Sequence, residues 1–183
     1  ILYVTAQEHA VPSSMLAMIK YIKAEKNDYE QLITVNSGNI KESEERLKRY
    51  NLSDIQIITR DDEKYLKSLS EAEYIFSDCG LEYYFAAKNN QKYFNLQTDN
   101  ISAKMTRKKE RECFEFATVQ KSIITPKASI YLTNESRLSF EKAYRCEMLP
   151  TSAIISDCPA FDMAGATNFA SSTDKIKILF TPQ

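Results

Sequence analysis

The chain has 183 residues, of which 43% are hydrophobic and 27% charged, and its formal net charge is −1. These values are ordinary for a soluble globular domain with one sizeable core, and the near-zero charge gives no overall attraction to nucleic acid. No apolar run approaches the roughly 20 residues that a membrane-spanning helix needs. The first residues, 1–5, resemble a core strand, with no initiator Met and no signal-peptide pattern, so we expect the chain to be part of a larger protein.

Cysteine, histidine and glycine usage limits the chemistry further. Cys79, Cys113, Cys146 and Cys158 form no CxxC pair, which predicts ordinary thiols in a reducing compartment. His9 is the only histidine, which excludes most His-based metal sites and catalytic triads. With three glycines the chain has no GxGxxG motif and no Walker loop. The sequence therefore predicts no metal and no cofactor.

Short β-favouring runs alternate with amphipathic segments along the first hundred residues. The predicted strands are residues 1–5, 29–35, 55–59, 74–76 and 93–96. The predicted helices are residues 12–22, 42–50 and 61–69. This alternation is typical of βαβ units and predicts an α/β fold, a Rossmann-like parallel sheet with helices on both faces.

The second half continues the alternation less regularly. It predicts a long helix over residues 104–119, then strands 129–133 and 153–156 on either side of a helix at 135–144. Residues 164–173 are rich in small side chains and predict a loop, and residues 175–182 predict a new strand. We expect residues 1–174 to form one domain, and residues 175–183 to be either a last sheet strand or the start of a connection to a second lobe.

Polar residues follow the strand at 93–96. In an open α/β sheet, ligands bind beyond the carboxyl ends of the strands. Gln97, Thr98, Asn100 and Ser102 are therefore candidate substrate-binding residues, and Asp99 and Asn100 are candidate catalytic residues. The alternative is an ordinary loop, since Asp and Asn are favoured in turns.

His9 follows the first strand and is the third catalytic candidate, because it should lie at the same edge of the sheet. The alternative is a solvated loop histidine without a partner.

A basic stretch follows the polar loop. Its cations are Lys104, Arg107, Lys108, Lys109 and Arg111. Two intervening glutamates leave a net charge of +3, which predicts weak contact with an anionic membrane surface at about 1 kcal/mol for each basic residue. The alternative is a solvated helix face. No nucleic-acid recognition module is present, so we expect no nucleic-acid partner.

Tyrosines are spread along the first hundred residues. Tyr65, Tyr74 and Tyr93 are predicted to fill the core or its margin, and so are Tyr83 and Tyr84. Stacking against a sugar is the alternative for Tyr83 and Tyr84.

Taken in order, these segments resemble the N-terminal half of the CDP-glycerol glycerophosphotransferase family. The family signature Leu-Gln-Thr-Trp-His-Gly-Thr-Pro follows a Tyr-rich strand, where this chain has the sequence LQTDNISA at residues 96–103. The other similar segments are residues 72–78 with 83–85, 104–116, 128–135, 157–162 and 177–182.

The resemblance implies an acceptor-side lobe of a two-lobe GT-B enzyme that makes teichoic acid or capsular polymer. A second lobe would bind the CDP-alditol, and a polyol-phosphate or glycan acceptor would attack its β-phosphate and release CMP. Family members work in the cytoplasm, peripherally at the inner face of the membrane.

The chain departs from the family at decisive positions. The catalytic His is replaced by Asn100, which cannot accept a proton as a general base does. Ile101 replaces Gly, and Ala160 replaces an Arg. These departures predict that this half of the active site is disabled or repurposed. Because the lobe that would hold the nucleotide is not part of this chain, we expect no turnover by the chain alone. The alternatives are a non-catalytic polymer-binding or scaffolding domain of the same ancestry, and a lobe of another GT-B glycosyltransferase.

Overall fold

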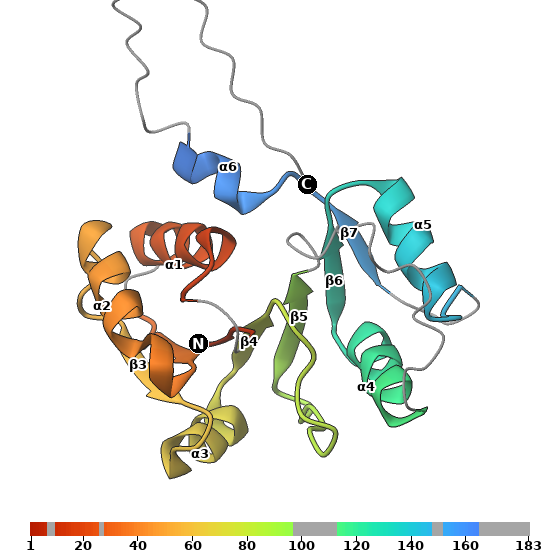
Figure 1. The fold of residues 1–183 in the computed structure, drawn as a ribbon, viewed down its shortest axis with the longest axis horizontal. Helices are drawn as coiled ribbons and strands as arrows, with labels where there is room; N and C mark the ends of the chain where they lie inside the picture. Colours follow the sequence, from red (N-terminus) through yellow and green to blue (C-terminus); the bar gives the residue numbers. More distant parts are fainter. Residues whose placement is uncertain (7–9, 26–27, 97–112, 148–151, 165–183) are drawn as a thin grey trace, which may run out of the picture.

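The computed structural model describes residues 1–6, 10–25, 28–96, 113–147 and 152–164, which form an α/β fold around one parallel sheet (Figure 1). The strands are β1 (Leu2–Val4), β2 (Leu32–Val35), β3 (Gln56–Thr59), β4 (Tyr74–Ser77), β5 (Lys92–Leu96), β6 (Ala128–Tyr131) and β7 (Ala153–Ile155). Within the described residues the sheet order is β3-β2-β1-β4-β5-β6-β7, and every neighbouring pair is parallel. The predicted Rossmann-like fold is confirmed.

The strand order has one reversal of direction. From β1 the chain adds β2 and β3 on one side, and then returns to place β4 on the other side of β1. The carboxyl ends of β1 and β4 therefore form the topological switch point, where open α/β sheets usually bind their ligands.

Helices cover both faces of the sheet, as predicted. They are α1 (Ser13–Glu25), α2 (Ile40–Arg49), α3 (Glu63–Glu71), α4 (Cys113–Ile124), α5 (Asn134–Ala143) and α6 (Pro159–Ala164), with a short 3-10 turn η1 (Ser37–Asn39). Helices α1 and α2 pack on one face, and α3, α4 and α5 pack on the other (Figure 1). Helix α6 lies against α1. No helix in the described parts of the chain is long and apolar enough to cross a membrane.

All seven strands predicted within the described residues are present, with shorter bounds at several ends. The helices differ more from prediction. Helix α4 continues to Ile124, five residues past the predicted end at 119, because Ile123 adds another buried side chain to the same helix. Helix α6 was not predicted; it begins at Pro159, a residue favoured in the first helical turn. The predicted strand 175–182 lies outside the described residues.

A row of three aromatic rings crosses the α1 face of the sheet. Tyr3 in β1 stacks on Phe76 in β4 with ring centroids 5.7 Å apart, and Phe76 stacks on Phe94 in β5 at 5.3 Å. The register pairs these residues directly across neighbouring strands, so the rings meet face to face. We call these three residues the aromatic row. Its ring contacts join the side chains of β1, β4 and β5 on this face of the sheet.

The connection from β4 to β5 crosses the opposite face without a helix. Leu81 and Phe85 bury their side chains there, while Lys121 of α4 donates hydrogen bonds through Nζ to the carbonyls of Tyr83 (2.5 Å) and Phe85 (2.6 Å). Tyr83 and Tyr84 are 64% and 55% exposed. The prediction that these two tyrosines fill the core is wrong, because the extended connection turns them outward. It is confirmed for Tyr65 and Tyr93, which are buried, and for half-buried Tyr74.

Candidate functional site

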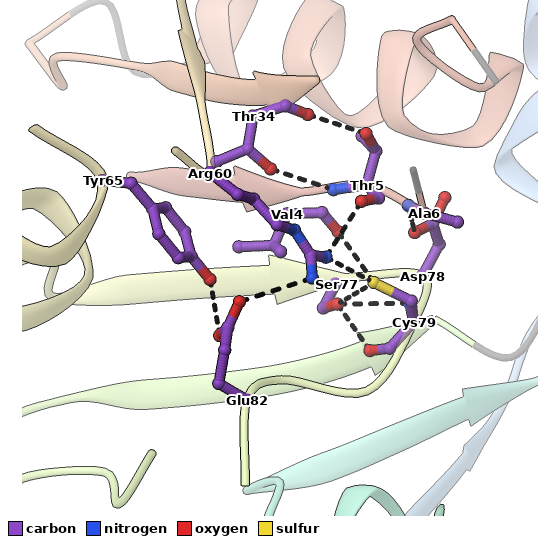
Figure 2. Close-up of polar contacts among 10 residues, drawn as sticks. All are labelled: Val4, Thr5, Ala6, Thr34, Arg60, Tyr65, Ser77, Asp78, Cys79 and Glu82. Atoms are coloured by element: carbon purple, nitrogen blue, oxygen red, sulfur yellow. Dashed lines mark hydrogen bonds and ion pairs between the residues drawn. The ribbon is translucent and has the colours of Figure 1, made fainter. Parts of the chain in front are cut away.

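The carboxyl end of the sheet carries a group of buried polar residues at the switch point (Figure 2). Val4 is in register with Ser77, so β1 and β4 end side by side. The next residues, Thr5 after β1 and Asp78 after β4, leave the sheet at this edge. Both are buried, at 1% and 6% exposure.

The strand that precedes the predicted site loop ends at the same edge of the sheet. Strand β5 is parallel to β4 and ends at Leu96, directly before Gln97. Three groups of predicted site residues lie outside the described residues. They are the candidate loop (Gln97, Thr98, Asp99, Asn100, Ser102), His9, and the basic residues Lys104, Arg107, Lys108, Lys109 and Arg111. Their roles stay predictions. Ala160, where the family has an Arg, lies in α6 beside α1.

Two sets of hydrogen bonds link the strand ends at the switch point. The Asp78 backbone N–H donates to the Val4 carbonyl (3.3 Å), and the Ala6 N–H donates to Asp78 Oδ1 (2.8 Å). On the other side of β1, Thr5 Oγ1 donates to the Thr34 carbonyl (2.7 Å). The Asp78 carboxylate thus joins β1 to β4 just beyond the ends of the two strands, and the Thr5 hydroxyl joins β1 to β2.

An arginine from the third strand completes the group. Arg60 follows β3, and its Nη2 donates to the Thr5 carbonyl and to Cys79 Sγ, each at 3.0 Å. Its Nη1 pairs with Glu82 Oε1 at 3.3 Å, while the Tyr65 hydroxyl donates to Glu82 Oε2 at 2.6 Å (Figure 2). We call Arg60, Tyr65, Cys79 and Glu82 the Arg60 cluster; it joins β1, β3, α3 and the segment after β4.

Local sequence places each member of this cluster. Asp62, two residues after Arg60, is the N-cap of α3 and accepts a hydrogen bond from the Lys64 N–H (2.8 Å). Tyr65 then lies in the first turn of α3, with its ring buried against the sheet. The Ser77 hydroxyl donates to the Cys79 carbonyl (2.6 Å), which makes the turn that brings Cys79 back over β1.

Electrostatics keep this cluster in one protonation state. Burial opposes the charge of Arg60, but Cys79, Tyr65 and Glu82 outweigh it and hold the Arg60 pKa above its ordinary value. Burial raises the pKa of the Cys79 thiol despite the nearby guanidinium. Burial, and then the hydrogen bond to Glu82, raise the pKa of Tyr65. At neutral pH Arg60 is charged, and Cys79 and Tyr65 hold their protons.

This arrangement is suited to holding backbone segments in place rather than to proton transfer. A protonated thiol is a poor nucleophile, and the charge of Arg60 is balanced by Glu82, so the cluster supplies neither an activated nucleophile nor a free cation. No group of three His, Cys, Asp or Glu side chains that would suit a metal ion occurs within the described ranges. The cluster instead fixes the strand ends from which the neighbouring loops leave the sheet.

The sequence contains a signal for these residues, which predicted candidates only after the first strand and after β5. Thr5, Arg60 and Asp78 are each a polar residue immediately following a strand, as is Gln97. The same rule used at every strand would have selected them. The partnership of Arg60 with Glu82, 22 positions along the chain, has no such signal.

Comparison of the chain with models of known protein families, with characterised proteins and with solved structures gives no match. The resemblance to glycerophosphotransferases therefore rests on the sequence segments described above.

Proposed function

We propose that this chain is the acceptor-side, N-terminal lobe of a protein like the CDP-glycerol or CDP-ribitol phosphotransferases of teichoic-acid or capsule biosynthesis. The observation that carries the proposal is the carboxyl end of β5. The segment resembling the family signature begins at Leu96, the last residue of β5, one strand away from a switch point with buried polar residues. This is the position that an acceptor site needs in a sheet of this order.

In this proposal the reaction takes place between two lobes. A second lobe holds the CDP-alditol, and the loop after β5 holds the polyol-phosphate or glycan acceptor through Gln97, Thr98 and Ser102. The protein works in the cytoplasm, and the basic residues between Lys104 and Arg111 bring it to the anionic inner face of the membrane.

The first test restores a histidine at position 100, where this chain has Asn. Full-length protein is assayed for transfer of labelled glycerol phosphate from CDP-glycerol to a teichoic-acid acceptor, as the natural sequence and as Asn100→His. We expect no transfer by this chain alone, and a gain of activity in the full-length His variant, because His can accept the acceptor's proton near neutral pH. Asn90→His, an exposed position in the β4–β5 connection, is the matched control. Turnover by residues 1–183 alone would contradict the proposal.

A second function, polymer binding without catalysis, is favoured by a specific observation. The catalytic His, the Gly and the Arg of the family are replaced by Asn100, Ile101 and Ala160. The two functions separate in the same assay: a full-length Asn100→His variant that stays inactive but binds the acceptor indicates a binding domain.

Binding to the isolated chain tests what both functions share. Calorimetric titration with oligo(glycerol phosphate) should show binding, whereas CDP-glycerol should show none because its site belongs to the second lobe. Binding of CDP-glycerol in preference to the oligomer would contradict the assignment to the acceptor side.

A further inference from the structure

A second candidate site lies near the amino end of the sheet, away from the Arg60 cluster. A groove of about 280 Å³ runs between α1 and the start of β4. Its lining residues are Ile1, Tyr21, Ile22, Glu25, Tyr29, Tyr74 and Phe76. Four of the seven are aromatic, and one is a carboxylate.

Two of the rings that line this groove meet nearly at a right angle. Tyr29 and Tyr74 lie almost perpendicular, with an interplanar angle of 79° and centroids 5.8 Å apart. Phe76 is held in the aromatic row between Tyr3 and Phe94, which fixes its position. Tyr21 stands on α1 with 66% of its surface exposed, so this wall is open to an incoming ligand.

Charges around the groove favour a cation. Glu25 lies on the lining, and Glu73 acts electrostatically on both Tyr29 and Lys92. The Lys92 ammonium lies 4.7 Å from the centre of the Tyr74 ring and donates to its hydroxyl at 3.1 Å. One ring of the groove therefore already holds an ammonium group of the protein. The N-terminal ammonium of Ile1, a second cation, donates to the Glu30 carbonyl at 2.7 Å, and the Glu30 and Glu73 carboxylates act on it electrostatically. Together with Glu25, these three carboxylates outnumber the two ammonium groups.

We propose that this aromatic groove binds a quaternary or methylated ammonium group, such as that of choline. The faces of aromatic rings attract cations, and groups of such rings are a common binding site for methylated ammonium. The methyl groups of such a cation would also contact the apolar wall of Ile1 and Ile22, which an unmethylated, strongly hydrated ammonium would do less well. Glu25 and Glu73 disfavour an anion. The inference is independent of the proposed function.

A neutral analogue of the same shape tests the role of charge. Full-length protein is titrated with choline and with 3,3-dimethylbutan-1-ol, in which carbon replaces the ammonium nitrogen. The chain has no Trp, so tyrosine fluorescence or NMR reports binding directly. We expect choline to bind roughly 2- to 30-fold more tightly than the neutral analogue, the range of a cation–π contribution. Equal affinities, or no binding of choline to the folded protein, would overturn the proposal.

Phosphocholine, as a second titrant, separates the sources of the cation. If it binds as well as choline, the groove accepts a phosphate-bearing headgroup or polymer substituent. If it binds more weakly, the acidic surroundings select the free amino alcohol. Either result supports an ammonium site provided that both ligands exceed the neutral analogue.

Two exposed positions allow variants that leave the core intact. Tyr21→Leu removes one ring, and Glu25→Gln removes one charge without a change in size. Each should weaken choline binding several-fold while leaving the neutral analogue nearly unaffected. Tyr83→Leu, at a tyrosine of similar exposure on the other face, is the matched control and should change nothing. If Tyr21→Leu and Glu25→Gln both bind choline like the natural protein, the groove is not the site.

Discussion

The Arg60 cluster and the aromatic row both join β1 to β4, but by different interactions. The row is a stack of rings whose contribution scales with buried area. The cluster depends on hydrogen-bond geometry and on the charge of Arg60 and Glu82, at side-chain exposures of 18% and 17%. The aromatic row should therefore be sensitive to changes in side-chain shape, and the Arg60 cluster should be sensitive to changes in charge.

High pH should affect both regions and cause the largest loss of stability. Burial raises the pKa of Tyr3 in the row and of Tyr65 in the cluster, so the folded state keeps protons that unfolded tyrosines lose near the ordinary pKa of 10.0. Stability is therefore fully present below pH 10 and falls above it. Each buried tyrosine contributes about 1.4 kcal/mol for each pH unit in that range.

Urea unfolding at pH 8, 10 and 11 measures this loss. Tyr93 and Tyr131, whose pKa values are also raised by burial, that of Tyr131 to about 12, add to it. Tyr3→Phe should flatten the alkaline slope by the share of one tyrosine, and exposed Tyr83→Phe should not change it. An identical slope for both variants would mean that Tyr3 ionises in the folded protein.

Phe76→Ala should cause the largest loss among single substitutions. Phe76 is the central ring of the aromatic row, and its removal leaves a cavity between Tyr3 and Phe94 at a cost of about 3–4 kcal/mol. Phe76→Leu keeps much of the volume and should cost about half as much or less. The free energy of unfolding in urea measures both. A loss below about 1 kcal/mol for Phe76→Ala would show that the row contributes little to joining the strands.

Arg60→Met should cost about 2–3 kcal/mol, because it leaves the largely buried Glu82 carboxylate without its cation. Glu82→Gln should cost a comparable amount, and the double variant less than the sum of the two. Lys23 and Asp54 form an ion pair with exposures of 29% and 61%, so the same cycle there should give less than about 1 kcal/mol. Strict additivity at Arg60 and Glu82 would show that the two side chains act separately.

The part of this structure that the sequence predicted well is the part fixed by local patterns. The alternation of short apolar runs with helical segments was sufficient to predict the parallel sheet. Strands β2 and β3 follow from their β-branched side chains, and α2 from its charged, helix-favouring residues. Short or irregular elements were less visible. Helix α6 spans six residues, too few for a periodic pattern.

The Arg60 cluster could not be predicted as a unit. Its members come from β3, α3 and the segment after β4, and nothing in the spacing of Arg60, Tyr65 and Glu82 indicates that they meet. The loop after β5 was predicted from its place after a strand, and the resemblance to a family signature was added to that. Leu96, the residue before the loop, ends β5 at the carboxyl edge of the sheet, while the roles of the loop residues stay predictions.

The smallest expected effect concerns how α3 supports the cluster. Asp62→Ala removes the N-cap of α3, and Thr133→Ala removes that of α5; each should cost about 1 kcal/mol. Only the first helix carries a member of the cluster, since Tyr65 lies in the first turn after Asp62. Asp62→Ala combined with Glu82→Gln should therefore deviate from additivity by at least about 0.5 kcal/mol, whereas Thr133→Ala with Glu82→Gln should be additive. If both pairs are additive, the cap stabilises α3 without positioning the Tyr65 hydroxyl, and the geometry of the cluster is set by the strand ends alone.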